Sequence, residues 1–350
     1  MDKTKAKKIA VIGSGIVGQA TGKGLVKVGH DVLFYDKNPV IVSSLKKEGY
    51  WADNIENITI DPQPDGKEIE TFMISVPTPT KNGHVELMFL KDALGMLGKA
   101  LKKASKKPVF VIRSTVPPGT TENLAVSILE QASGKKYPKD FGVCMNPEFL
   151  REVSAEKDFS NPWMVVIGSN DKSAGLLLEE IYKKFNCPVV HMSLKEAEMM
   201  KYAHNLLNAT KISFFNEMRL VSDVVGADPE IFFPVVVKSA EAMWNPEYGI
   251  KNFGPYGGVC LPKDTEAFFT WVLETTNFEM PVLKGTMKTN RIMQEIVSSN
   301  QLIKNLEQEI ELETYHIMPM LEKKFLPKEF SKKQKIKSKS RDSAMQTLPL

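Results

Sequence analysis

The feature that most constrains the fold is a glycine-rich turn near the start of the chain. It follows Ile9–Ile12, a short, wholly apolar run of the kind expected for a strand buried on both faces. The turn is followed by a helical pattern and by a second apolar run, Val32–Tyr35, which ends in Asp36. A G-x-G-x-x-G pattern is weak alone, but here it follows a strand, opens a helix and precedes an acid 18 residues beyond its last glycine. We therefore predict a βαβ unit that binds a dinucleotide.

The residues of this turn suit a pyrophosphate physically. Gly13 permits the tight turn, Gly15 lets the pyrophosphate approach the backbone, and Gly18 lets helix and strand pack closely. The helix N-terminus supplies N–H groups and a dipole that favours negative charge. Asp36 can accept a hydrogen bond from a ribose 2′-hydroxyl and would repel a 2′-phosphate, so NAD is expected rather than NADP.

Polar side chains follow the later apolar runs at the points where strands are expected to end. These runs are Thr71–Val76, Pro108–Ile112, Phe141–Met145 and Trp163–Ile167. The polar residues at their ends are Ser75, Thr78, Ser114, Thr115, Asn146 and Glu148. Each of them alone could be a loop or capping residue. Ligands bind beyond the carboxyl ends of an open parallel sheet, so together they favour one shared site.

The remainder of the chain has a helical pattern. Apolar residues recur at helical spacing from Lys195 to about Val225 without proline, which predicts one long helix joining two domains. Helical segments are expected up to residue 305, interrupted by a loop over 245–264. The predicted fold class is therefore α/β, with a Rossmann-type doubly wound sheet in 1–194, the connecting helix, and an all-α central domain in 195–305. Residues 306–350 are predicted to be a short remnant and a disordered Lys-rich tail.

Charge and composition exclude several functional classes. The net charge is +4, but the stretch from Glu322 to Asp342 holds nine basic and three acidic residues, so the rest is near −2. A specific nucleic-acid partner is therefore not expected. The chain shows no signal peptide and no apolar run of membrane-spanning length, which favours the cytoplasm. Three cysteines and five histidines form no disulfide or metal-ligand pattern, so no metal is expected.

One cysteine has a distinctive setting, Gly257-Gly258-Val259-Cys260-Leu261-Pro262-Lys263-Asp264. If the chain turns helically after Cys260, Asp264 returns to the same face. The charge of Lys263 and nearby backbone amides could favour a thiolate. A buried cysteine in a turn is the alternative interpretation. Lys201 and Asn205, four residues apart on the predicted long helix, also share a face, although such a pair is common on helix surfaces.

Taken in order, these motifs make the chain resemble the UDP-glucose/GDP-mannose dehydrogenase family, NAD-dependent four-electron oxidases of nucleotide sugars. The resemblance covers roughly residues 8–305. Beyond the turn and Asp36 it rests on Ser75–Pro79, Ser114–Thr121, Asn146–Glu152, Ala197–Asn205, Lys211–Glu217 and Gly257–Asp264. It implies an oxidoreductase of CH–OH donors that serves polysaccharide biosynthesis and forms a homodimer through the long helix. UDP-glucose is the first expected substrate, with UDP-N-acetylmannosamine or GDP-mannose behind it.

The resemblance also implies a role for each site residue. Cys260 would be the nucleophile, adding to an aldehyde to give a thiohemiacetal and then a thioester. Lys201 and Asn205 would stabilise the oxyanion, Asp264 with Thr115 would manage proton and water, and Glu148 would be the hydrolytic base. The implied NAD-binding residues are Gly13, Ser14, Gly15, Ile16, Val17, Gly18, Asp36, Lys37, Ser75, Val76, Pro77, Thr78, Ser114, Thr115, Glu152 and Lys263. The implied substrate-binding residues are Glu148, Phe149, Leu150, Arg151, Glu152, Lys201, Asn205 and Gly257.

Two alternatives follow from a departure from the family pattern. Members of the family carry a third, nucleotide-binding domain, whereas only 86 residues follow Asp264, so a complete third domain is not expected here. The chain could then be a catalytically silent NAD-binding remnant that serves as a dimerisation or regulatory subunit. A two-electron hydroxyacid dehydrogenase is a further alternative, but it would not need Cys260.

Overall fold

The structure is a computed structural model that describes residues 6–60, 68–250, 254–258 and 260–325, with the backbone alone for 306 and 309–325. The chain divides into two compact units, Met1–Ala209 and Thr210–Leu350. The division lies inside the long helix rather than at its start. The functional domain boundaries at 194 and 305 stay predictions.

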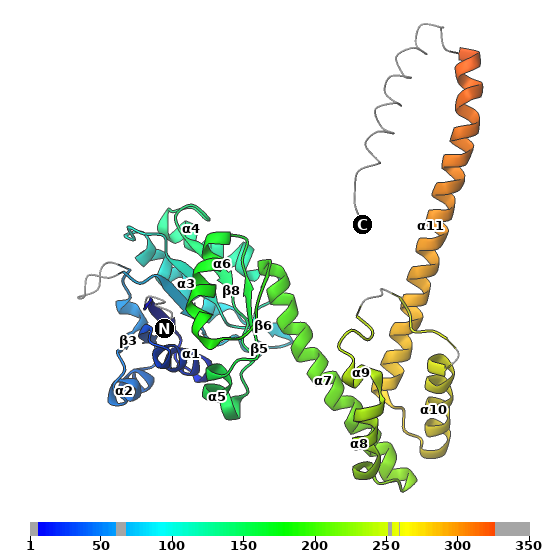
Figure 1. The fold of residues 1–350 in the computed structure, drawn as a ribbon, viewed down its shortest axis with the longest axis horizontal. Coiled ribbons are helices and arrows are strands. Elements are labelled where there is room, and N and C mark those ends of the chain that lie inside the picture. Colours follow the sequence, from blue (N-terminus) through cyan, green and yellow to red (C-terminus); the bar gives the residue numbers. More distant parts are fainter. Residues whose placement is uncertain (1–5, 61–67, 251–253, 259, 326–350) are drawn as a thin grey trace. The chain divides into compact units, whose positions relative to one another are not determined.

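The first unit is built on an eight-stranded sheet (Figure 1). Six of its strands lie on the predicted apolar runs, whereas the short strands Ala52–Asn54 and Val189–Met192 were not predicted. Its order is β10-β9-β8-β7-β4-β1-β2-β3. The strands are β1 (Lys8–Ile12), β2 (Asp31–Asp36), β3 (Ala52–Asn54), β4 (Thr71–Ile74), β7 (Val109–Ile112), β8 (Gly142–Met145), β9 (Val165–Gly168) and β10 (Val189–Met192). The strand order runs from β1 to β3 toward one edge of the sheet and from β4 to β10 toward the other, so a switch point lies between β1 and β4. Open α/β sheets bind ligands at such a switch point. A two-stranded ribbon, β5 (Thr80–Lys81) and β6 (His84–Val85), follows β4.

Helices cover both faces of this sheet because successive side chains of each strand point to opposite sides. In β1, Ala10 and Ile12 belong to one hydrophobic cluster, and Ile9 and Val11 to the other. The first cluster is completed by α3 (Met88–Leu101), α4 (Val126–Ser133) and the start of α7 (Leu194–Val225). The second is completed by α1 (Ile16–Lys27), α2 (Pro39–Lys47), α5 (Ala155–Ser160) and α6 (Lys172–Tyr182). The predicted doubly wound fold is thus confirmed.

Short helical turns complete the connections of the first unit. They are η1 (Ile55–Asn57), the π-helical turn η2 (Thr120–Ala125), η3 (Glu152–Ser154) and η4 (Lys183–Phe185).

The eight-stranded sheet is mostly parallel. Its described pairings are parallel except that of β8 with β9, which meet antiparallel at the single pair Met145 and Gly168. The Asn146 side-chain amide donates to the Val166 carbonyl oxygen (2.7 Å), so a side chain takes a place that backbone would fill in a regular ladder. The strand expected from Trp163 begins only at Val165.

The predicted long helix is confirmed as α7, which runs from the first unit into the second. The second unit also contains α8 (Pro229–Ser239), α9 (Glu241–Trp244), α10 (Cys260–Thr276) and α11 (Pro281–Phe325). Its described core is small, comprising Val221, Val272 and Met280. Glu217 of α7 accepts the backbone N–H groups of Val282 (2.6 Å) and Leu283 (3.1 Å) and so caps the start of α11.

Two expected boundaries in the second unit differ from the structure. The loop expected to reach residue 264 ends at Cys260, where α10 begins; the helical turn inferred for that stretch is confirmed. Helix α11 continues beyond residue 305 to Phe325. The sequence between Gly285 and Pro319 holds no glycine or proline to stop it, and Pro319 itself lies inside the helix. The predicted disorder of residues 326–350 lies outside the described residues.

Candidate active site

The glycine turn joins β1 to α1 and explains why each glycine is needed. A β-carbon on Gly13, whose φ is +82°, would lie 2.9 Å from the Ser75 carbonyl oxygen, and one on Gly18 would lie 1.9 Å from the Gly13 carbonyl oxygen. A β-carbon on Gly15 would have no atom within 4 Å. Gly13 and Gly18 are therefore required by the turn itself, whereas Gly15 keeps open the space in front of the helix N-terminus. This geometry fits a bound pyrophosphate.

Asp36 closes the turn at the end of β2. One carboxylate oxygen accepts the Ser14 N–H (2.6 Å), and the other accepts the Asn38 N–H (2.8 Å). The predicted ribose-binding acid is thus held beside the glycine turn. Lys37 is exposed, and its Nζ lies 4.0 Å from Asp92 Oδ2. The Ser14 hydroxyl is buried and has no hydrogen-bond partner among the described residues.

The loops after β4 and β7 are bound to each other. Ser114 donates to the Val76 carbonyl oxygen (2.6 Å), and Thr78 donates to the Thr115 carbonyl oxygen (2.8 Å). The sequence-predicted residues Val76, Thr78, Ser114 and Thr115 are therefore brought together at one edge of the sheet. The hydroxyl of Ser75 at the same edge is buried and finds no partner among the described residues.

A buried ion pair joins the loop after β8 to α7. Lys201 Nζ lies 3.1 Å from Glu148 Oε1 and also donates to the Glu148 carbonyl oxygen. Both side chains are largely buried, with exposures of 7% and 14%. Lys201 also lies 5.6 Å from the centre of the Phe149 ring, whose other neighbours are Trp163 and His204. Burial, followed by the charge of Lys201, lowers the pKa of His204.

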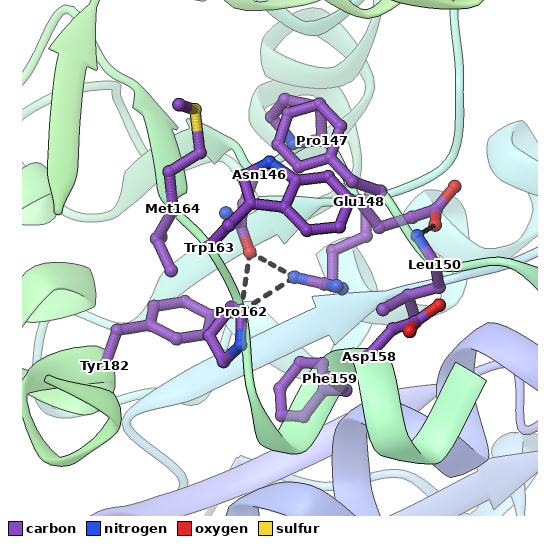
Figure 2. Close-up of a pocket in the computed structure, with 13 residues that line it drawn as sticks. Asn146, Pro147, Glu148, Leu150, Asp158, Phe159, Pro162, Trp163, Met164 and Tyr182 are labelled. Atoms are coloured by element: carbon purple, nitrogen blue, oxygen red, sulfur yellow. Dashed lines mark hydrogen bonds between the residues drawn. The ribbon is translucent and has the colours of Figure 1, made fainter. Parts of the chain in front are cut away.

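A buried hydrogen-bond network that sequence reasoning missed holds Asn146, two residues before Glu148. Arg113 donates to the Asn146 side-chain oxygen and to the Tyr182 hydroxyl (2.7 Å), and Tyr182 donates to the same Asn146 oxygen (2.6 Å). Figure 2 shows Asn146 and Tyr182 with Glu148 around a cavity of about 40 Å³, room for roughly three waters. The only sequence signal was the position of Arg113 and Asn146 immediately after their strands.

The stretch after Glu148 makes its own hydrogen bonds. The Leu150 N–H donates to Glu148 Oε2 (2.6 Å). Arg151 donates to Asp158 from its backbone N–H, Nε and Nη2 at 3.0, 3.0 and 2.6 Å, which holds the pKa of Asp158 well below its usual range. The Arg151 side chain is therefore engaged with Asp158, and Glu152 follows on the exposed turn η3.

Cys260 and the residues around it lie in the second unit. Cys260 is exposed and is the first residue of α10. Asp264, one turn later, is paired with Lys263. By contrast, Cys144 is fully buried in β8, and burial raises its pKa to about 12. Before the cysteine, Gly257 has no atom near its missing side chain, and Gly258 has a φ of +75°. On α7, Asn205 is exposed.

The described residues hold neither a metal site nor a membrane-spanning helix. No cluster of three or more His, Cys, Asp or Glu side chains among them could hold a metal ion. Within the same residues, no helix combines the length and the apolar character needed to cross a membrane.

Comparisons with known proteins agree with this geometry. The NAD binding domain of the UDP-glucose/GDP-mannose dehydrogenase family matches residues 7–186, and the central domain of that family matches residues 195–292. GDP-mannose 6-dehydrogenase of Pseudomonas savastanoi pv. phaseolicola is 34% identical over 299 residues, which are 81% of this chain and 68% of the relative. UDP-glucose 6-dehydrogenase TuaD of Bacillus subtilis is 35% identical over 303 residues, covering 81% and 63%.

Solved structures show the same likeness. A GDP-mannose dehydrogenase from Pseudomonas aeruginosa, solved as a ternary complex, has a TM-score of 0.76 at 30% identity, covering 83% of this chain and 71% of that one. A UDP-glucose dehydrogenase from Pyrobaculum islandicum has a TM-score of 0.63 at 32% identity, covering 83% and 69%. With a dinucleotide turn at the switch point of its sheet and both family domains matched, the chain belongs to the UDP-glucose/GDP-mannose dehydrogenase family and is an NAD-dependent oxidoreductase of CH–OH donors.

Proposed function

We propose that this chain oxidises the C6 alcohol of a nucleotide sugar to a carboxylate in two steps. The observation that carries the proposal is the buried Lys201–Glu148 pair, which lies at the end of β8 in the same sheet that holds the dinucleotide turn. At a ligand-binding edge, a buried cation can stabilise negative charge that develops on oxygen, and the carboxylate beside it can accept a proton from water.

The chemistry balances with one cysteine and two molecules of NAD. When bound, NAD would supply the hydride acceptor for each of the two oxidations. Loss of a hydride and a proton turns the alcohol into an aldehyde, and the Cys260 sulfur adds to its carbon while the oxygen takes a proton. Loss of a second hydride and proton leaves a thioester. Water then attacks its carbonyl carbon, the carbon–sulfur bond breaks, and the carboxylate and free thiol are released.

The proposed roles follow from the chemistry of each side chain. Lys201 and Asn205 donate to the oxygen that becomes negative, and Glu148 takes the proton from the attacking water. Asp264 and Thr115 position that water. The exposure of Cys260 supports its role as the nucleophile, because an exposed sulfur can reach the carbon of a bound substrate.

UDP-glucose is the first candidate substrate. GDP-mannose is the second, and the higher TM-score to a GDP-mannose dehydrogenase favours its inclusion. UDP-N-acetylmannosamine is the third candidate, since a dehydrogenase of that nucleotide sugar shares the fold.

The test counts NADH formed per sugar consumed by the purified chain with each of the three nucleotide sugars. Two NADH per sugar with one of them is the expected result and identifies the substrate. Cys260→Ser should stop carboxylate formation, whereas the control Cys187→Ser, which changes a half-buried cysteine, should not. Binding of NAD without turnover of any sugar would contradict the proposal and favour a silent subunit; one NADH per sugar would favour a two-electron dehydrogenase.

We also propose that the partner of the second unit is another copy of this chain. Its described core has three buried apolar residues, whereas many large apolar side chains of the same unit are exposed, including Ile212, Phe214, Leu220, Ile231, Trp244 and Trp271. Apolar surface of this extent marks an interaction site. Sedimentation equilibrium should give twice the 39.2 kDa chain mass; a monomer at micromolar concentration would contradict the proposal.

A further inference from the structure

Glu198 of α7 joins that helix to the loop after β7. Glu198 is fully buried. One carboxylate oxygen accepts the Gly119 N–H and the other accepts the Thr121 N–H (2.7 Å). These amides begin the π-helical turn η2, where Gly119 has a φ of +91°. Both oxygens of a buried carboxylate are thus occupied by backbone donors of one loop.

The same loop is held from its other side by the loop after β4. Hydrogen bonds from Ser114 to Val76 and from Thr78 to Thr115 fix the segment that precedes Gly119. Thr115 therefore lies between two anchors. One anchor is the loop after β4, and the other, Glu198, belongs to α7.

The first turns of α7 contact the ends of three strands. Ala197 packs against Gly168, at the end of β9. A β-carbon placed on Gly168 would lie only 2.5 Å from the β-carbon of Ala197. Glu198 binds the loop after β7, and Lys201, three residues later, binds Glu148 after β8. Residues three apart on a helix lie on one face, so a rigid helical turn sets the spacing between the two loops.

We propose that Glu198 is a positioning residue that sets Thr115 relative to the Lys201–Glu148 pair for hydrolysis of the thioester. The inference rests on the proposed function and deepens it. Hydrolysis needs water, base and oxyanion donors in place together, whereas hydride transfer depends on the glycine turn. A displacement of about 1 Å at such a site can cost roughly a hundredfold in rate.

Glu198→Gln tests this with almost no change of shape. The amide can accept from one of the two backbone N–H groups, but its NH2 faces the other, so donor meets donor. Glu196→Gln is the matched control, because Glu196 is an exposed glutamate on the same helix that accepts the Ser193 N–H (2.7 Å). Glu198→Asp, which keeps the charge but withdraws it by one methylene, serves if the glutamine variant does not fold.

The experiment mixes each full-length variant with NAD and the accepted nucleotide sugar, and follows NADH by stopped flow and protein mass by electrospray. For Glu198→Gln we expect an NADH burst, a steady rate at least tenfold below wild type, an acyl adduct on Cys260 and unchanged NAD affinity. Glu196→Gln should match wild type and carry no adduct. The adduct is the decisive readout, because a merely loosened fold would lower the rate without moving the slow step to hydrolysis.

Each other outcome has a definite meaning. Wild-type turnover in Glu198→Gln, or slow turnover without an adduct in both Glu198 variants, would overturn the inference and leave the proposed function intact. A wild-type chain that turns over none of the nucleotide sugars would refute the proposed function and this inference with it.

Discussion

Two alanine substitutions in one turn should have opposite effects on folding, since Gly18 and Gly15 have different surroundings. A β-carbon on Gly18 would lie 1.9 Å from the Gly13 carbonyl oxygen and 3.3 Å from Val11 Cγ1. Non-bonded carbon contacts need about 3.5 Å, so the backbone of the turn must part by roughly 1.5 Å. Overpacking costs about 1–3 kcal/mol, and here the upper value applies because the obstacle is backbone. At about 2–4 °C per kcal/mol, Gly18→Ala should lower the Tm by about 6–12 °C.

Gly15→Ala is the matched variant. Its β-carbon meets no atom within 4 Å, and the residue has a φ of −70°, which alanine adopts freely. Folding stability should therefore be unchanged or raised by up to about 1 kcal/mol. The same β-carbon enters the space through which a pyrophosphate approaches, so NAD affinity should fall at least tenfold.

Urea unfolding followed by circular dichroism gives the stability of both variants, and calorimetric titration gives their NAD affinity. The reasoning fails if Gly18→Ala is as stable as wild type, or if Gly15→Ala unfolds as easily as Gly18→Ala. Wild-type NAD affinity in Gly15→Ala would show that the dinucleotide does not approach this turn.

Two further substitutions test contacts far from the turn. Burial lowers the pKa of His30, whose Nδ1 accepts the Lys7 N–H (3.2 Å) while Nε2 faces the Ile181 carbonyl oxygen (3.0 Å). The folded state therefore prefers the neutral ring, so this stabilisation is complete above the unfolded pKa of about 6.5 and is lost as pH falls through the folded pKa. His30→Gln should reduce the loss of unfolding free energy between pH 8 and pH 5.5. Glu217→Ala removes the cap of α11 and should cost about 1–2 kcal/mol by urea unfolding.

Each of these two has a simple control. An unchanged pH dependence in His30→Gln would mean that the imidazole is not the group that titrates. Glu266→Ala, on an exposed position of α10, should leave stability within about 0.5 kcal/mol of wild type. If it costs as much as Glu217→Ala, the capping argument does not hold.

Local sequence was sufficient for the elements that local physics controls. The buried strands, the glycine turn and α7 are each encoded in fewer than 40 consecutive residues by apolar spacing, by glycine positions and by the absence of proline. The predicted carboxyl-end residues meet at one edge because parallel strands share a direction. The length of α11 was underestimated, since a change in composition was taken for the end of a helix that continues through Pro319.

Contacts between distant residues were decided only by tertiary structure. Nothing in the pattern around Arg113 shows that it shares a buried network with Tyr182, 69 positions away, nor that Glu198 accepts backbone amides 77 and 79 positions before it. Such contacts depend on which loop each helix crosses after the sheet has formed, and the side chains involved look like ordinary surface residues in the sequence. The sequence by itself thus determined the fold and the chemical groups, and the packing of α7 across the strand ends decided which of those groups meet, because burial leaves each charge only the partners within its reach.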